Sequence, residues 1–213
     1  MSDPPLFDES FRQLLNQLFL WRRDVRRFKR DPLSDELLKN LLDLACLAPS
    51  VGLSEPWRFV MVRSPAIREE VRTEFTRANE AALGGYEGSQ AEQYAKLKLS
   101  GLEEAPVHLA VFTDRSTTQG HGLGRQTMPE TLDYSAVMAI HTLWLAARAH
   151  GVGVGWVSIL DPVRIGTLLK VPHSWSLTAY LCIGLPEEEF DVPELQRVKW
   201  ERRAKRGECI FSR

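Results

Sequence analysis

Cysteine is scarce in this sequence, and neither sign of charge predominates. The three cysteines, Cys46, Cys182 and Cys209, lie far apart, form no C-x-x-C pair and have no histidine at metal-ligand spacing. We therefore expect neither a disulfide framework nor a metal site. The 27 Lys and Arg residues against 28 Asp and Glu residues give a formal net charge of −1, which argues against nucleic-acid binding through bulk positive charge.

Long apolar runs are also absent. No stretch approaches about 18 uninterrupted apolar residues, the length that a membrane-spanning helix needs. The first residues carry Asp3, Asp8 and Glu9 where a secretory signal has a basic region followed by an apolar run. These absences predict a cytoplasmic protein without a membrane segment.

The composition that is present is that of a globular domain, with 44% hydrophobic and 26% charged residues in a chain of 213. We expect one domain over residues 1–213, with an extended polar tail from about residue 186. Hydrophobic periodicity and capping residues predict helices at 9–21, from 35 to before Pro49, from about 65, at 131–150 and from 162, and strands at 57–62, 106–112, 154–159 and 176–183. Few strands, separated by helices or long loops, predict an α+β protein with a mixed sheet covered by helices.

Two of these segments have unusual composition. The helix at 131–150 has almost no polar face, so we expect it in the centre of the domain or in a subunit interface. Residues 81–101 contain three glycines and polar side chains before Leu97-Lys98-Leu99. This segment predicts a loop with a helical piece, a candidate lid over a site.

The densest chemical signal is Arg22-Arg23-Asp24-Val25-Arg26-Arg27, at the end of the first helix. Guanidinium groups bind phosphate oxygens in pairs, and four of them close together repel each other unless an anion is present. The alternative is a solvated basic face paired with acids elsewhere. Asp24, surrounded by cations, suits a salt bridge or a carboxylate that acts on a bound ligand. A second basic run, at residues 197–206, contains Arg203 and would share the same phosphate if the fold brings the two runs together.

A glycine run, Gly151-Val152-Gly153-Val154-Gly155, follows a helix and enters a strand. The dinucleotide-binding fingerprint has the opposite order, so we reject that fold. The glycines allow close approach of either a bound ring or a packed helix. Ser158, just beyond, lacks the G-x-S-x-G context of a hydrolase nucleophile and, on the residues alone, reads as a satisfied hydroxyl.

Taken in order, these motifs resemble the 5,6-dimethylbenzimidazole synthase family, a branch of the nitroreductase-like flavoproteins. The resemblance extends from about Trp21 to Arg203. The motifs that carry it are Arg22-Arg23-Asp24-Val25-Arg26, Ala48-Pro49-Ser50-Val51-Gly52 with Pro56-Trp57, Leu97-Lys98-Leu99, Trp144-Leu145-Ala146-Ala147-Arg148-Ala149 and Gly151 to Ser158.

The resemblance implies a three-layer α/β/α fold and a domain-intertwined homodimer with flavin mononucleotide (FMN) at the interface. It also implies that reduced FMN is the substrate. Dioxygen fragments it into 5,6-dimethylbenzimidazole, the lower ligand of vitamin B12, and erythrose 4-phosphate. NAD(P)H would act through a separate flavin reductase.

The resemblance also assigns roles to residues. Asp24 is expected to transfer a proton, and Ser158 to hydrogen-bond near the ring and ribityl chain. The expected flavin contacts are Arg22, Arg23, Asp24, Val25, Arg26, Ser50, Gly52, Leu99, Ser158 and Arg203. Gly52 would admit the ring close to its backbone, and Leu99 would belong to the lid.

Three other functions remain open on the sequence. An NAD(P)H-dependent nitroreductase or flavin reductase would share the fold, the dimer and the phosphate site, and would differ only in the Asp24 and Ser158 pair. A non-catalytic flavin carrier would use the arginines to hold phosphate alone. Nucleic-acid binding through the two arginine runs is the least favoured of the three.

Overall fold

The computed structural model describes residues 3–213, apart from the side chains of Arg206 and Glu208. Helices begin where the sequence supplies their caps: Asp8, Ser34 and Asp161 each accept a hydrogen bond from a backbone N–H of the first turn. The helices are α1 (Glu9–Trp21), α2 (Asp35–Ala45), α3 (Pro65–Leu83), α4 (Gly88–Ala95), α5 (Thr131–Ala149), α6 (Pro162–Leu168) and α7 (Glu194–Arg197), with the 3-10 turns η1 (Val51–Leu53), η2 (Gln119–Gly122) and η3 (Arg206–Cys209).

The strands form one sheet in the described part of the chain. They are β1 (Trp57–Met61), β2 (Val107–Asp114), β3 (Gly153–Val157) and β4 (Trp175–Gly184), in the order β1-β2-β4-β3. All three strand pairs are antiparallel, where the sequence predicts a mixed sheet. The spacing could not settle this, because the long connections between strands suit either direction. Among residues 3–213, parallel pairing is confined to one isolated bridge, between Asp24 and Val154.

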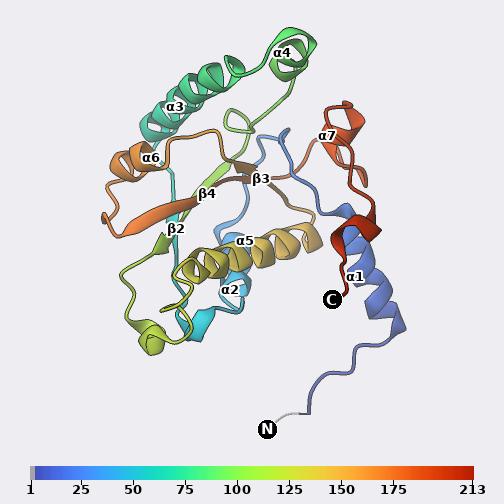
Figure 1. The fold of residues 1–213 in the computed structure, drawn as a ribbon, viewed down its shortest axis with the longest axis vertical. Coiled ribbons are helices and arrows are strands. Elements are labelled where there is room, and N and C mark those ends of the chain that lie inside the picture. Colours follow the sequence, from blue (N-terminus) through green and yellow to red (C-terminus); the bar gives the residue numbers. More distant parts are fainter. Residues whose placement is uncertain (1–2) are drawn as a thin grey trace.

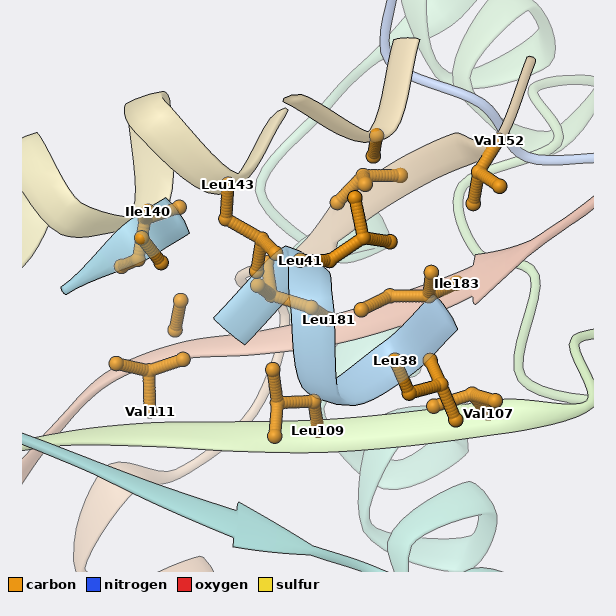
Figure 2. Packing of buried hydrophobic residues seen from close by; sticks show 14 residues of the cluster. Leu38, Leu41, Val107, Leu109, Val111, Ile140, Leu143, Val152, Leu181 and Ile183 are labelled. Carbon is orange, nitrogen blue, oxygen red and sulfur yellow. The ribbon is translucent and has the colours of Figure 1, made fainter. Parts of the chain in front are cut away.

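Side chains that alternate along β2 and β4 divide the interior into two layers. Leu109 and Leu181 face α2 and α5, in the core drawn in Figure 2. Phe112 and Tyr180 face the other side, where α3 and α6 cover the sheet. The expected three-layer α+β fold is confirmed, and Figure 1 shows α5 crossing one face of the sheet with α3 and α6 on the other side.

Helix α5 has two kinds of surroundings. It buries Ala139, Ile140 and Leu143 against the sheet, in agreement with the expected central position. Tyr134 and Met138, on its outer side, stay exposed in the single chain. This helix also separates two parts of the candidate site, because its first turns adjoin η1 whereas its last turns adjoin α1.

Candidate functional site

The arginine run leaves α1 as an extended segment that joins the edge of the sheet at β3. The backbone N–H of Val25 donates to the carbonyl of Val154 over 3.1 Å. A Cβ on Gly155 would lie 2.0 Å from the Val25 carbonyl oxygen, and one on Gly153 would lie 2.8 Å from a Val25 methyl. The glycine run therefore admits this extended segment at close range, so its glycines have a reason in the packing of the chain itself.

The Asp24 carboxylate is held by one donor on each oxygen. Oδ1 accepts from the backbone N–H of Trp156 over 2.9 Å, and Oδ2 accepts from Nε of Arg26 over 2.9 Å. Its side chain is 32% exposed, against 14% for Arg26. The carboxylate is thus fixed in direction and still accessible from outside, as a proton-transfer group must be.

Arg26 also reaches the candidate lid. Its Nη1 donates to the carbonyl of Lys98 over 2.9 Å, so one guanidinium joins Asp24 to the segment that follows α4. Leu99, the next residue, is half-buried. Both contacts are made within the chain, and the flavin contact that the sequence predicts for Arg26 stays a prediction.

Arg22, Arg23 and Arg203 form a cationic cluster. Burial lowers the pKa of Arg22; the charge of Asp24 acts in the opposite direction, and that of Arg203 lowers it further. The pKa of Arg23 is also lowered, by burial first and then by the positive charges of Arg203 and Arg22. The two basic runs therefore come together, as the phosphate interpretation requires.

The cluster is held by uncharged partners. Arg23 donates to the carbonyl of Asp191, and the guanidinium carbon of Arg22 lies 4.9 Å from the centre of the Trp144 ring. Nε1 of Trp144 donates to the carbonyl of Arg23 over 3.2 Å. Among the described side chains, no carboxylate comes within ion-pair distance of any of the three arginines. The cluster thus keeps positive charge that an anion would neutralise.

Ser158 lies just past the end of β3 and is exposed. The turn that follows is fixed by buried Glu74, whose carboxylate accepts from the backbone N–H of Asp161 over 3.2 Å. Asp24 and Ser158 are therefore both attached to the same end of β3.

Ser50 and Gly52 lie elsewhere, at the first turns of α5. The backbone N–H of Val51 donates to Oγ of Ser135 over 3.0 Å. Since Trp144 is nine residues further along α5, the two regions are about 13 Å apart along the helix axis. One chain therefore does not bring Ser50 and Gly52 to Asp24.

Gly52 has a local reason to be glycine. Its φ is +57°, and a Cβ there would lie 2.7 Å from the Leu123 carbonyl oxygen in the loop that contains η2. In the single chain, the backbone at Leu123 therefore lies close to Gly52, where we expect the flavin ring to approach.

The cavity beside the arginine run is small. It measures about 50 Å³ and is lined by Arg23, Asp24 and Arg26 together with the tail residues Glu189 and Phe190. Small-molecule pockets typically measure roughly 300–1,000 Å³. A flavin site at this position would need further surface to enclose it.

The described residues contain neither a metal-ligand cluster nor a membrane-spanning helix. No three side chains from His, Cys, Asp and Glu gather as a metal site would require. No helix there combines the length and the apolar character of a membrane span.

A sequence model of the nitroreductase family matches residues 19–185. This span covers most of the chain and contains the Asp24 segment, β3 and Ser158. The chain belongs to the nitroreductase family. Two curated members of similar length are close to it. The 5,6-dimethylbenzimidazole synthase of Rhodospirillum rubrum is 57% identical, over 95% of this chain and 96% of that protein, and that of Rhodobacter capsulatus is 50% identical, over 92% and 94%.

Two solved structures have a similar fold. Iodotyrosine deiodinase, bound to FMN and 3-iodo-L-tyrosine, is 25% identical with a TM-score of 0.69 and covers 83% of this chain and 91% of its own. A BluB-like flavoprotein from Clostridium difficile is 22% identical with a TM-score of 0.67 and covers 93% and 99%.

The sequence analysis missed some contacts of the site. The backbone N–H of Trp156 and the carbonyl of Lys98 carry no side-chain signal, so only the fold reveals them. Trp144 stands within one of the motifs used for the resemblance, but its role under Arg22 could not be read from a helix that is apolar on nearly every face.

Proposed function

We propose that this chain is a 5,6-dimethylbenzimidazole synthase that acts on reduced FMN and dioxygen. The observation that carries the proposal is the Asp24 carboxylate, which is fixed by Trp156 and Arg26, accessible from outside and adjacent to a cationic cluster that forms no ion pair among the described side chains. The identity of 57% to a synthase over almost the whole chain supports the same activity.

The cationic cluster fits the phosphate of FMN. Arg22, Arg23 and Arg203 offer planar donors for phosphate oxygens. Burial, the largest cause, lowers the pKa of Arg22 and of Arg23, and the positive charge of Arg203 lowers both further, so a phosphate would stabilise their charged forms. Iodotyrosine deiodinase, a solved structure with a similar fold, binds FMN. The flavin, when bound, supplies the carbon skeleton and the electrons for the reaction with dioxygen.

The remaining residues act around the ring. Asp24 receives or delivers a proton at a carboxylate oxygen, and Ser158 hydrogen-bonds beside it. The segment with Leu99 covers the site and excludes water, which protects a slow carbon–carbon cleavage from faster side reactions with water. Arg26 holds this segment and Asp24 in one arrangement.

A homodimer completes the site in this proposal. The cavity of a single chain is small, and Ser50 and Gly52 lie at the far end of α5. Tyr134 and Met138 on α5 and Leu123 beside η2 are exposed large apolar side chains of the kind that a subunit interface covers. A second copy would bring its Ser50 and Gly52 to the first copy's Asp24. The reduced flavin would come, in the cytoplasm, from a separate NAD(P)H-dependent flavin reductase.

The test is to load the protein with reduced FMN without oxygen, admit air and analyse the products by mass spectrometry. We expect 5,6-dimethylbenzimidazole and erythrose 4-phosphate from the wild type. Fast oxidation of NADPH with intact FMN recovered would instead identify a nitroreductase or flavin reductase. Tight FMN binding with neither reaction would identify a carrier.

A further inference from the structure

The C-terminal tail contacts the candidate lid through one aromatic residue. The Trp200 ring lies 5.6 Å from that of Tyr86, edge-on at 80°, and 6.2 Å from that of Tyr94, at 62°. The two tyrosines stack on each other at 4.8 Å. Edge-to-face and offset arrangements at these distances are the favourable geometries of aromatic pairs. These three rings, here called the aromatic latch, join the tail to α4.

On the lid side, the latch is anchored firmly. Tyr94 is 6% exposed, and its hydroxyl donates to Oδ1 of Asn79 on α3 over 2.7 Å. Helix α4 ends at Ala95, and the carbonyl of Lys98 then accepts the hydrogen bond from Arg26. The candidate lid is therefore attached at one end to Arg26 and at the other to the latch.

On the tail side, the arginine run binds the segment of the tail that precedes Trp200. Arg23 donates to the carbonyl of Asp191, and Arg27 pairs with Glu194 over 2.8 Å. Arg203, three residues beyond Trp200, belongs to the cationic cluster. The tail thus contacts the arginine run before Trp200, and beyond Trp200 it brings the charge of Arg203 close to Arg22 and Arg23.

The backbone beside Trp200 has a conformation that is uncommon for its residue type. Lys199 has φ of +60°, in the left-handed region that favours glycine, and the backbone N–H of Trp200 donates to the carbonyl of Leu195 over 2.8 Å. This sharp end of α7 turns the chain so that the indole meets Tyr86 and Tyr94. Such a conformation persists only where the surrounding contacts hold it.

We propose that Trp200 is a positioning residue that links the phosphate-binding arginines to the lid through the aromatic latch. This inference rests on the proposed flavin site. A phosphate held by Arg203 fixes the tail, the tail fixes Trp200, and Trp200 holds α4 and the segment with Leu99 over the site. A flavin without phosphate would occupy the ring position and leave the lid free to open.

Hydrogen exchange of the amides at 88–100 tests the latch in the protein without flavin. We expect Trp200→Ala to speed this exchange about tenfold, which corresponds to about 1.4 kcal/mol of local opening, because exchange reports the stability of each segment. Trp200→Phe keeps a ring and should stay within about threefold of the wild type, since aromatic pairing is largely preserved.

Phe211→Ala, at an exposed aromatic residue further along the tail, is the matched control and should leave the exchange at 88–100 unchanged. Unchanged exchange in a folded Trp200→Ala variant would overturn the proposal. If that variant does not fold, Trp200→Leu gives the same test with apolar volume retained.

Adding FMN or riboflavin tests the link to phosphate. In the wild type, FMN should slow exchange at 88–100 more than saturating riboflavin does, and in Trp200→Ala the two flavins should protect equally. Greater protection by FMN in Trp200→Ala, as large as in the wild type, would overturn the link. If neither flavin binds, the proposed function fails, while the flavin-free comparison still decides whether the latch exists.

Discussion

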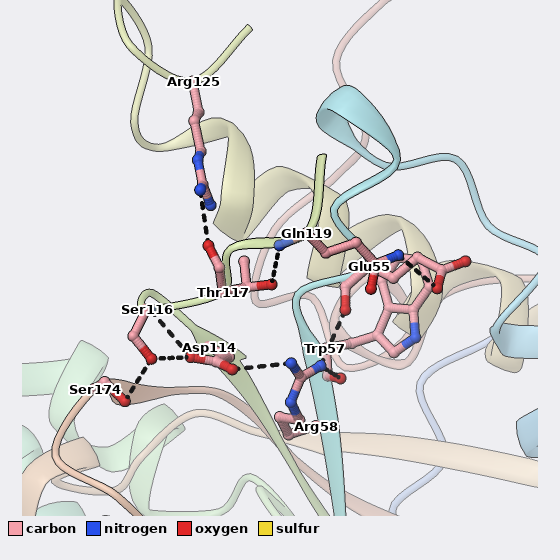
Figure 3. Close-up of polar contacts among 9 residues, drawn as sticks. All are labelled: Glu55, Trp57, Arg58, Asp114, Ser116, Thr117, Gln119, Arg125 and Ser174. Carbon is pink, nitrogen blue, oxygen red and sulfur yellow. Dashed lines mark hydrogen bonds and ion pairs between the residues drawn. The ribbon is translucent and has the colours of Figure 1, made fainter. Parts of the chain in front are cut away.

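Two arginine–aspartate pairs adjoin the sheet, one at the end of β2 and one beside β3, and they differ in what surrounds them. Asp114, at the end of β2, accepts from Arg58 over 2.9 Å and from both the backbone N–H and the hydroxyl of Ser116. Its side chain is 12% exposed, and Ser116 continues the network to Ser174, as Figure 3 shows. Asp24 has one donor per oxygen, is more exposed, and faces a cationic cluster that its own pairing with Arg26 leaves unneutralised.

The comparison separates a structural ion pair from a functional one. The Arg58 guanidinium also donates hydrogen bonds to the carbonyls of Glu55 and Trp57. The charged groups of the Arg58–Asp114 pair therefore both have partners within the chain. Around Asp24, positive charge remains and one side is open. Charge that the protein does not neutralise by itself is the better indication of a ligand, because its burial is favourable only when an anion arrives.

The largest effect is expected from Asp24→Asn. The amide keeps the shape and accepts a hydrogen bond, but it cannot take up a proton. Product formation should fall by about a thousandfold, within the usual range for general acid–base groups. FMN affinity should stay within about tenfold, roughly 1.4 kcal/mol. Product yield by mass spectrometry and binding by flavin fluorescence measure the two quantities. Wild-type yield from the variant would remove Asp24 from the mechanism.

Gly155→Ala should separate Asp24 from β3 without changing any charge. The new Cβ would meet the Val25 carbonyl oxygen at 2.0 Å, so the arginine segment must move away from the strand. We expect a loss of about 3 kcal/mol in the free energy of unfolding, at the upper end for overpacking, and a loss of product. Urea denaturation and the product assay measure these effects.

Gly166→Ala is the matched control for this change. Its Cβ would lie 3.6 Å from a Val171 methyl, an ordinary contact, and alanine favours the helix α6 by up to about 1 kcal/mol. Equal behaviour of the two variants would contradict the close packing of Val25 on β3.

The sequence predicted the local elements well because caps and periodicity are local. Helix α1 begins and ends at the expected residues, and the four strands lie where apolar runs occur. Strand direction was not available, since it depends on contacts between distant segments. The same reason applies to the site. The arginine run could be recognised by its composition. The groups that hydrogen-bond to it, at Trp156, Lys98 and Asp191, are backbone groups that any residue could supply.

Asp114→Asn should affect stability and spare activity. Burial alone would raise the pKa of Asp114, but the hydrogen bonds from Ser116 and the charge of Arg58 outweigh it and lower the pKa. The ionised form is thus favoured by folding, and its contribution is present above the unfolded pKa of about 3.9 and lost as the pH falls below it. At pH 7 the variant should lose about 2–3 kcal/mol by urea denaturation, as expected for hydrogen bonds to a charged group. A loss of turnover per folded molecule as large as that of Asp24→Asn would contradict the distinction between the two pairs.

The smallest effect concerns His108. This residue contributes to the loss of stability at acid pH, which must be known before the effects of the two aspartates on stability are compared. It is fully buried, and its Nδ1 lies 3.0 Å from the Tyr180 hydroxyl. Burial, followed by the charges of Arg68 and Arg72, lowers the pKa of His108 to about 3. The unfolded chain binds this proton near pH 6.5 and the folded chain does not, so stability is complete above pH 6.5 and falls as the pH decreases from there towards 3. Between pH 7 and 5 the loss in the free energy of unfolding should be about 2 kcal/mol.

His108→Gln cannot bind the proton, so its urea midpoint should change less over this range than that of the wild type. His173→Gln, at an exposed histidine, should keep the wild-type dependence. An unchanged acid dependence in His108→Gln would show that His108 is not the group that titrates over this range.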